Sequence, residues 1–343
     1  MNEYNNKVFI IAEAGVNHNG SLDLAKQLVL AAKSSGADAV KFQTFKADKL
    51  VRKDVQQAEY QTINTGVKES QYDMLKRLEL SSDEHIALKE FCIEHDIIFM
   101  STPFDLDSID FLASLDMQIW KIASGEITNV PYLRKVASVA KDIILSTGMS
   151  TLEEVEFAVS IIKATGFDLS NLTLLHATSE YPCPIDQINL KAMHTLRDRF
   201  GVKVGYSDHT QGIHIPFLAS ALGAEVIEKH FTLDRSLEGP DHKSSLEPNE
   251  LLEMVTYIRQ LPLVMGDGVK QPSSGEVKNI ILARKYIVAK KDIEVGELFD
   301  ETNLDSMRAG GEISASHWDE LIDKKSSRHY MIGEKISLRE LSQ

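Results

Sequence analysis

Two histidines each follow a short apolar run of the chain, and neutral imidazoles are common ligands of divalent transition metals. His209 comes shortly after the run Val202–Gly205, and His230 comes shortly after the run Glu225–Glu228. If these runs are consecutive parallel strands, the two imidazoles lie near each other at the carboxyl edge of a sheet. A lone histidine is more often structural, but this pair predicts a metal site. With the other coordination positions left to oxygen or water, the site would be open and catalytic in type.

Two lysines and several short hydroxyl side chains occupy the corresponding places after other apolar runs. Ammonium groups and hydroxyl donors match the oxygens of phosphate and carboxylate groups. Ser124-Gly125 also precedes a predicted helix, whose first backbone N–H groups are free to bind an anion. Either lysine alone is as easily a salt-bridged structural residue. Together the side chains predict a cradle for a small phosphorylated acid, formed by Lys41, Thr102, Lys121, Ser124, Ser146 and Ser207.

Glu13 is the best candidate for a general acid or base. Its carboxyl group follows an apolar strand, where it can exchange a proton with a bound reactant. A structural ion pair between Glu13 and Lys41 is the alternative, and the sequence leaves both interpretations open.

Eight apolar or β-branched runs must position these side chains, and they alternate with stretches of helical periodicity from Val8 to about Leu261. This alternation is typical of parallel βαβ units. Eight such units favour a closed (β/α)8 TIM barrel over an open doubly wound sheet, and no GxGxxG turn follows the first run. The predicted strands centre on Phe9–Ala12, Ala39–Phe42, Ile97–Met100, Ile119–Ile122, Ile143–Leu145, Leu172–Leu175, Val202–Gly205 and Glu225–Glu228.

Each predicted strand ends in polar groups, and the carboxyl ends of barrel strands converge on one face. A solvated loop would explain one such end, but not eight in register. We therefore expect an active site at this face. The groups are Glu13, Lys41 with Gln43, Ser101 with Thr102, Lys121 with Ser124, Ser146 with Thr147, His176, Ser207-Asp208-His209 and Glu228-Lys229-His230.

Local signals predict where helices begin and where a loop is unusual. Ser81 with Glu84, and Thr151 with Glu154, have the spacing of capping boxes. The segment 46–80 is too long for an ordinary loop between a strand and a helix. We expect it to cover the mouth of the barrel as a lid or substrate loop.

The alternation of apolar runs and helical periodicity ends after Leu261, where Gly- and Pro-containing stretches predict a turn and a linker. We expect a barrel domain over residues 1–265, a linker over 266–280 and a small β-rich domain over 281–343. The small domain has strand-like runs at Tyr286–Ala289 and Lys335–Leu338 and a helical patch at His317–Ile322.

Composition excludes some classes of partner. The 343-residue chain carries a formal net charge of −14, which repels nucleic acid and anionic membranes. No apolar run reaches the roughly 18 residues of a membrane-spanning helix, and the polar start at residues 1–7 lacks the pattern of a secretory signal. Cys92 and Cys183 form neither a disulfide framework nor a cysteine-based zinc site. We expect a cytoplasmic protein with no nucleic-acid or membrane partner.

A series of motifs, in order along the chain, resembles those of the sialic acid synthase family over essentially the whole sequence. The C-terminal segment resembles the antifreeze-like (SAF) domain that this family carries, so the resemblance implies a (β/α)8 barrel followed by a SAF domain. The motifs are Ala12-Glu-Ala-Gly-Val-Asn-His-Asn-Gly20, Val40-Lys-Phe-Gln-Thr44, Ser101-Thr-Pro-Phe104, Lys121-Ile-Ala-Ser-Gly-Glu126, Leu145-Ser-Thr-Gly-Met149, Tyr206-Ser-Asp-His-Thr210, Glu228-Lys-His-Phe-Thr232 and Gly239-Pro-Asp-His242.

The resemblance implies a role for each candidate residue. His209 and His230 match the family's Mn²⁺ ligands, and Glu13 matches the carboxylate that exchanges a proton with water. Phosphoenolpyruvate would be held by Lys41, Thr102, Lys121, Ser124, Ser146 and Ser207. The sugar site would be lined by Gln43, Tyr181 and Asn64.

Arg308 falls where the family places an arginine that one chain contributes to the sugar site of another, which implies a domain-swapped homodimer. The chain departs from the family's usual pattern beside two of these residues. Ser179-Glu180 precedes Tyr181 where many members have Asn or Thr ahead of a similar triplet, and Ala309-Gly310-Gly311-Glu312 follows Arg308 where many members have a rigid Pro-Gly turn.

The activity implied is a condensation in which C3 of phosphoenolpyruvate attacks the aldehyde of an N-acetylated mannosamine-type sugar. Addition of water and loss of phosphate would give N,N'-diacetyllegionaminate or N-acetylneuraminate. One alternative is another phosphoenolpyruvate-condensing barrel acting on a different sugar, either of the pseudaminate type or a phosphorylated aldehyde that needs additional cations. A non-catalytic carbohydrate-binding protein is a further alternative, but it leaves the polar strand ends unexplained.

Overall fold

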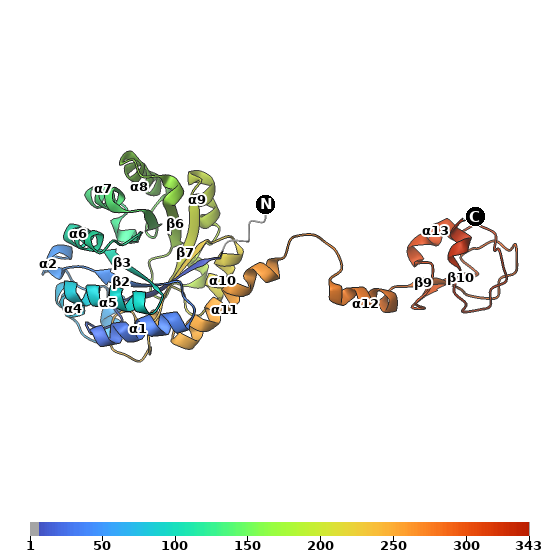
Figure 1. Cartoon of the computed structure of the whole chain (residues 1–343), viewed down its shortest axis with the longest axis horizontal. Helices are drawn as coiled ribbons and strands as arrows, with labels where there is room; N and C mark the ends of the chain where they lie inside the picture. Colours follow the sequence, from blue (N-terminus) through green and yellow to red (C-terminus); the bar gives the residue numbers. More distant parts are fainter. Residues whose placement is uncertain (1–6, 343) are drawn as a thin grey trace. The chain divides into compact units, whose positions relative to one another are not determined.

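The computed structural model describes residues 7–342 and divides into two compact units between Asp267 and Gly268 (Figure 1). Residues 1–6, on which part of the expected absence of a secretory signal rested, lie outside the described residues, as does residue 343. Within the described range, no helix is both long and apolar enough to span a lipid bilayer.

The first unit is a barrel of eight parallel strands, as the alternating sequence pattern predicted. The strand order β3-β2-β1-β8-β7-β6-β5-β4 runs once around the barrel, and its two end strands, β3 and β4, lie beside each other. The strands are β1 Phe9–Gly15, β2 Ala39–Thr44, β3 Ile98–Pro103, β4 Ile119–Ile122, β5 Asp142–Ser146, β6 Leu172–Ala177, β7 Lys203–Asp208 and β8 Val226–His230.

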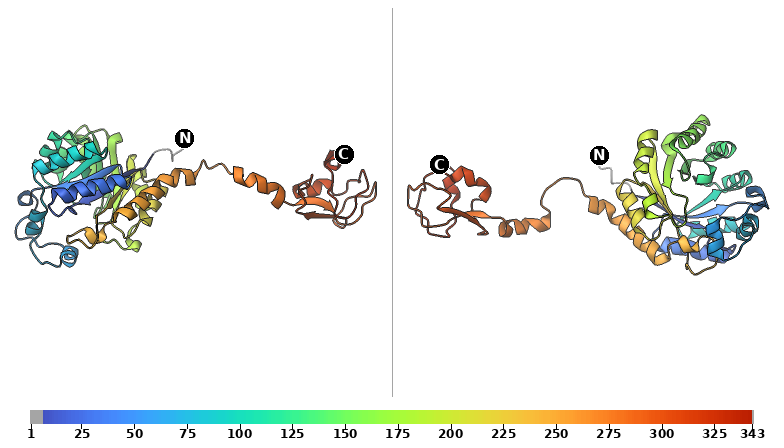
Figure 2. Two further views of the ribbon diagram at one scale, coloured as in Figure 1. Left: turned by 60° about the horizontal axis from the view of Figure 1, so that its bottom comes forward. Right: turned by 180° about the vertical axis from the view of Figure 1, so that it is seen from behind.

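Helices surround these strands, as Figure 2 shows from two further sides. They pack on the outward-facing side chains of the strands, such as Ile10, Val40 and Ile227, to form the main hydrophobic core. The predicted capping boxes at Ser81 and Thr151 begin two of the helices. The helices that follow the strands are α1 Leu22–Ser34, α5 Ser82–Glu94, α6 Leu106–Ser114, α7 Val130–Val139, α8 Leu152–Ala164, α9 Ala192–Phe200, α10 His214–Ala221 and α11 Pro248–Met265.

A second apolar cluster fills the inside of the barrel. Because side chains alternate between the two faces of a strand, a residue two positions further along points to the same face. The interior residues Ile11, Ala39 and Val226 are therefore followed on the same face by polar groups nearer the carboxyl ends of their strands. The interior cluster consists of Ile11, Ala39, Met100, Ile144, Leu175 and Val226.

The long segment 46–80 forms three short helices, α2 Ala47–Leu50, α3 Glu59–Thr65 and α4 Gln71–Leu78. Met74 and Leu78 of α4 pack with Phe45 and Val16 in a small separate core. The segment is thus anchored to the first two strand ends, beside the mouth that it was expected to cover.

The second unit contains less regular strand than the predicted β-rich domain. A two-stranded sheet in this unit pairs β9 Tyr286–Ala289 with the antiparallel β10 Leu304–Met307. The predicted run Lys335–Leu338 makes only an isolated bridge, from Lys335 to Val288, and the predicted helical patch forms α13 Trp318–Leu321. A separate apolar core built around Ile287, Phe299 and Tyr330 holds this unit together.

Helix α12, Ser274–Ala283, occupies the second half of the segment 266–280 that was expected to be a linker. Ser273 caps this helix and Glu276 completes the capping box, which supplies partners for the first free N–H groups. The apolar residues of α12 make up no buried face in the structure.

Candidate active site at the carboxyl ends of the barrel strands

Two lysines and two glutamates form a buried layer directly above the apolar interior of the barrel. Lys41 Nζ lies 2.5 Å from Glu13 Oε2 and 3.6 Å from Glu228 Oε2. Lys121 Nζ lies 3.3 Å from Glu228 Oε1. All four side chains are almost completely buried. Glu228, on β8, therefore contacts both lysines, which come from β2 and β4.

The predicted hydroxyl groups border this layer. Lys41 donates to Thr102 Oγ1 over 3.1 Å, and Ser207 donates to Glu228 Oε1 over 2.8 Å. Ser124, in a short 3-10 helix after β4, accepts the backbone N–H of Gly148. The hydroxyl of Ser146 is buried without a hydrogen-bond partner. An unsatisfied buried donor of this kind suits a site whose ligand supplies the missing acceptor.

The ionisation of the layer follows from its burial and its opposed charges. Burial raises the pKa of Glu13 to about 7, although the charge of Lys41 opposes this rise. Burial also lowers the pKa of Lys121. For Lys41 and Glu228, burial opposes the charged forms, but their partners outweigh it: the two carboxylates raise the pKa of Lys41, and the two lysines lower the pKa of Glu228. Glu13 is thus the group in this layer that titrates near neutrality.

The two predicted metal ligands lie together at the rim of the same layer, with ring centroids 5.6 Å apart. His209 Nδ1 donates to the carbonyl of Thr178 over 2.7 Å, which leaves Nε2 as an acceptor for the Tyr181 hydroxyl at 3.0 Å. His230 Nδ1 is buried without a partner. Burial lowers the pKa of both imidazoles, so both are neutral.

These imidazoles fit a divalent metal ion, because each presents an unprotonated nitrogen and one of these nitrogens lacks any hydrogen bond. Within residues 7–342, no group of three or more His, Cys, Asp or Glu side chains is arranged to hold a metal. His209 and His230 would therefore be joined by water or substrate oxygens.

The predicted sugar-site residues have different surroundings. Gln43 Nε2 donates to Glu13 Oε1 over 3.3 Å, and the ring of Tyr181 lies 4.1 Å from that of His209, so both residues are at the mouth. Asn64, in α3, donates to the carbonyl of Pro240 over 2.6 Å. Arg308 is an exposed residue directly after β10, in the second unit.

Several of the polar groups predicted to converge on the mouth point away from it, including Ser101, which contacts Thr44, and Asp208. His176 lies on the outer side of β6, where its Nε2 contacts the carbonyl of Ile188 at 2.7 Å. Lys229 is completely buried and pairs with Asp208. Glu228, for which the sequence pattern predicted no individual role, contacts both lysines in the structure. Its position two residues before His230, on the same strand face, was the available signal.

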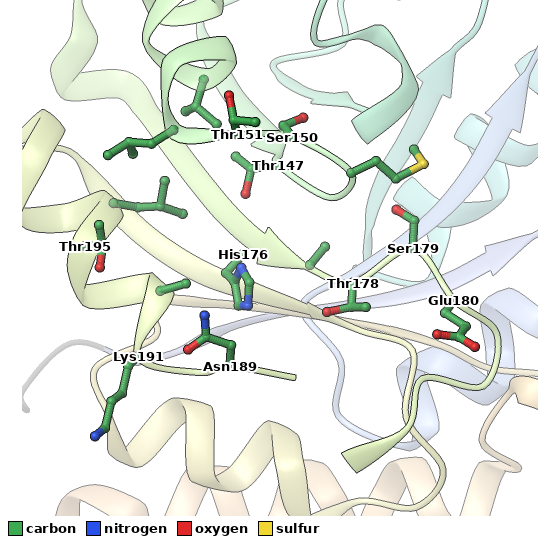
Figure 3. Close-up of a pocket in the computed structure, with 16 residues that line it drawn as sticks. Thr147, Ser150, Thr151, His176, Thr178, Ser179, Glu180, Asn189, Lys191 and Thr195 are labelled. Carbon is green, nitrogen blue, oxygen red and sulfur yellow. The ribbon is translucent and has the colours of Figure 1, made fainter. Parts of the chain in front are cut away.

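A pocket of about 750 Å³ lies between α8 and α9, on the outer side of β6 to which His176 points. It is bounded by the loop after β5, the end of β6 and the start of α9, and Figure 3 shows its hydroxyl and amide side chains. Thr178, Ser179 and Glu180 line the pocket, and Tyr181 follows them at the mouth.

The fold and this site define the chain as a (β/α)8 barrel of the enzyme type, with a buried layer of charged side chains at the carboxyl ends of its strands. The sequence model of the NeuB family matches residues 28–270, and the chain belongs to this family.

Similar proteins cover nearly the whole chain. The N,N'-diacetyllegionaminic acid synthase of Campylobacter jejuni is 52% identical over 96% of this chain and 99% of its own length. The protein of the same name from Legionella pneumophila is 51% identical over 95% of this chain and 92% of its own length. A crystal structure of the N-acetylneuraminic acid (sialic acid) synthetase from Leptospira borgpetersenii superposes with a TM-score of 0.69 at 38% identity, covering 80% of this chain and 91% of that chain.

Proposed function

We propose that the protein is a phosphoenolpyruvate-dependent synthase that condenses an N-acetylated mannosamine-type sugar into a nonulosonic acid, with N,N'-diacetyllegionaminate as the product. Membership of the NeuB family supports the class of reaction. Two relatives that are more than half identical to the chain are named as synthases of this acid. The structural observation that carries the proposal is the buried layer of lysines and hydroxyls above the barrel interior.

Lys41 and Lys121 hold the phosphate and carboxylate of phosphoenolpyruvate, with hydroxyl contributions from the bordering side chains. In the free protein Glu13 and Glu228 neutralise the two lysines. An incoming anion adds negative charge beside Glu13, whose pKa is already about 7. Binding therefore favours the protonated form of Glu13.

C3 of phosphoenolpyruvate attacks the aldehyde carbon, and the aldehyde oxygen takes up a proton that protonated Glu13 supplies, directly or through water. A water molecule then adds to C2 and gives one proton back to Glu13. The C2–O bond to phosphate breaks, the new C2 hydroxyl becomes the keto group, and its proton leaves with the phosphate. Lys41 and Lys121 stabilise the charge that shifts onto the phosphate during this step.

We propose Mn²⁺ as the cofactor, with His209 and His230 as its protein ligands. The unpartnered His230 Nδ1 and the unprotonated Nε2 of His209 support this assignment. The metal, when bound, supplies a Lewis acid for the aldehyde oxygen. Tyr181, which donates to His209 Nε2 in the free protein, would turn this hydroxyl toward the sugar.

We assign the sugar to the mouth of the barrel, beside the buried layer of lysines and glutamates. Gln43 and Tyr181 would contact the sugar near its aldehyde end, and Asn64 would contact it from the segment 46–80.

We propose that the protein is a cytoplasmic, domain-swapped homodimer in which the SAF-like second unit of one chain brings Arg308 to the sugar site of the other. Support comes from the resemblance at Arg308 and from the division of the chain, because Arg308 lies in the second unit and the other proposed site residues lie in the barrel unit.

A product analysis tests the proposed reaction. The purified chain is incubated with phosphoenolpyruvate, Mn²⁺ and, in separate reactions, 2,4-diacetamido-2,4,6-trideoxymannose, N-acetylmannosamine or a phosphorylated sugar, and the products are identified by mass. The diacetamido sugar should react fastest, with one phosphate released per product. Reaction with the phosphorylated sugar alone would favour the other phosphoenolpyruvate-condensing class. No reaction with any sugar, by a protein that binds Mn²⁺, would favour a binding protein.

A further inference from the structure

A completely buried ion pair joins the residues that directly precede the two histidines. Lys229 Nζ lies 2.5 Å from Asp208 Oδ2, and neither side chain has any exposed surface. Asp208 precedes His209 and Lys229 precedes His230. The two residues are register partners on β7 and β8, so the ion pair spans the two neighbouring strand ends that carry the imidazoles.

The ion pair lies on the outer face of the barrel wall, away from the reactants. Ser207 and Glu228 are the preceding register partners, and they contact each other at the mouth. Because side chains alternate along a strand, Asp208 and Lys229 point to the opposite face. They cannot touch a substrate held by the interior lysines.

The same two side chains also hold the residue after His209. Asp208 accepts the backbone N–H of Thr210 over 3.1 Å and its hydroxyl over 3.0 Å. Lys229 donates to the Thr210 carbonyl oxygen. The backbone on both sides of His209 is therefore tied to the residue beside His230.

Stability alone does not account for this arrangement. Desolvation of two buried charges offsets most of their attraction, and replacing both with apolar residues is often neutral or stabilising. What a buried, multiply hydrogen-bonded pair does supply is a defined geometry. Here the geometry that it defines is the relative position of two strand ends.

We propose that Asp208, Lys229 and Thr210 form a clamp that fixes the spacing of the His209 and His230 imidazoles and thereby sets the affinity of the protein for a divalent metal. The three are positioning residues. The proposal rests on the assignment of these histidines as metal ligands.

The double variant Asp208→Leu with Lys229→Met tests the clamp in the full-length protein, because it leaves no unpaired charge. We expect the Kd for Mn²⁺, measured on metal-free protein by electron paramagnetic resonance, to rise about 10- to 100-fold, the usual effect of losing a residue that orients a metal ligand. The visible absorption of the Co²⁺ form should shift as the ligand geometry changes. The milder Thr210→Val variant should give a smaller rise in Kd in the same direction.

The matched control is the ion pair of Asp38 with Arg259, whose atoms are also 2.5 Å apart but which lies at the amino end of β2. Asp38→Leu with Arg259→Met should leave the Kd for Mn²⁺ and the Co²⁺ spectrum unchanged. Folded Asp208→Leu/Lys229→Met protein with wild-type affinity and spectrum would overturn the clamp, as would a wild-type Kd for Thr210→Val if the double variant does not fold. Wild-type protein that binds no Mn²⁺ would instead reject the metal assignment.

Discussion

At the scale of single residues, the site depends on charges held out of water. Lys41 and Lys121 each face a carboxylate, so the free site is close to electrically balanced. Burial lowers the pKa of Lys121 and raises that of Glu13 to about 7. A bound anion would take over part of the neutralisation of the two lysine charges, which Glu13 and Glu228 provide in the free protein.

Lys121→Ala is expected to raise the KM for phosphoenolpyruvate roughly 10- to 100-fold, since a hydrogen bond between charged groups contributes about 1.5–3 kcal/mol. The KM for the sugar should change far less, because Lys121 pairs with the buried Glu228 and is assigned to phosphoenolpyruvate. Steady-state kinetics with each substrate varied in turn measures both constants. An equal rise in both would remove the assignment of Lys121 to phosphoenolpyruvate.

Glu13→Gln is expected to change how stability depends on pH. In the folded protein Glu13 keeps its proton up to about pH 7, whereas its ordinary pKa is 4.5. The folded state thus binds more protons between these values, and the contribution of Glu13 to stability falls as pH rises through this window.

Relative to Glu13→Gln, the metal-free wild type should therefore lose up to about 3 kcal/mol of unfolding free energy between pH 4.5 and 7, with a constant difference above pH 7. Urea unfolding at each pH gives this difference. Parallel curves for the two proteins across the whole range would mean that Glu13 ionises normally.

His209→Ala and His230→Ala are each expected to abolish turnover while the protein stays folded, because each removes one of two proposed protein ligands. Chelator treatment should reproduce the loss, and added Mn²⁺ should restore activity to wild type but not to either variant. Circular dichroism checks the fold. Full activity of chelated wild-type protein would reject a catalytic metal.

At the scale of elements, strand pairing decides which polar groups meet. Glu13, Lys41 and Glu228 come from β1, β2 and β8, which are neighbours around the barrel. Ser207 on β7 reaches Glu228 because the two residues are register partners. Gly205 allows β7 and β8 to lie close together, because it has no side chain. A Cβ atom at this position would lie 2.3 Å from the carbonyl oxygen of Val226 and 2.7 Å from the side chain of Leu175.

Gly205→Ala is accordingly expected to destabilise the protein by about 1–3 kcal/mol through overpacking. Because β7 and β8 carry the two histidines, the affinity for Mn²⁺ should weaken together with stability. Urea unfolding and a Mn²⁺ titration measure the two effects. Gly125→Ala is the matched control, since a Cβ atom there would have no neighbour within 4 Å. Equal stability of the two variants would contradict this account of the β7–β8 contact.

At the scale of the whole molecule, the division into two units separates the proposed site residues. The lysines, histidines and Glu13 belong to the barrel unit, and Arg308 belongs to the second unit with its own core. The sequence Ala309-Gly310-Gly311 after Arg308 leaves its backbone freer than a rigid proline turn would. We therefore expect bound sugar to order this loop.

Mixing two inactive variants tests whether the units of different chains cooperate. If Arg308 serves the site of a second chain, a heterodimer of Arg308→Ala and Glu13→Gln chains contains one intact site. Complete exchange should then restore about one quarter of wild-type activity, because half of the dimers are mixed and each has one working site of two. Subunit exchange is checked by mass spectrometry of differently tagged chains. No recovery despite exchange would show that each chain serves its own site.

Much of the fold could be predicted from sequence because it rests on local signals. The eight strands were predicted within a few residues, since a strand buried on both faces needs a continuous apolar run. Helix starts at Ser81 and Thr151 follow from capping. Ser273 and Glu276 have the same capping-box spacing, which would have predicted a helix there. The structure has α12 in part of the segment that was expected to be a linker.

The tertiary structure decided which of the chemically similar side chains face the site. Lys121 and Lys229 both stand at strand ends, but the first points into the mouth and the second into a buried ion pair outside it. The register and closure of the barrel set these directions, and a shift of one residue would exchange the two faces. The central position of Glu228, the raised pKa of Glu13 and the protonated nitrogen of His209 likewise depend on neighbours distant in sequence. The sequence by itself determined which groups are present and at which strand ends, because those follow from local patterning. Which groups touch, and which of them carry charge, was decided only when the strands closed into a barrel.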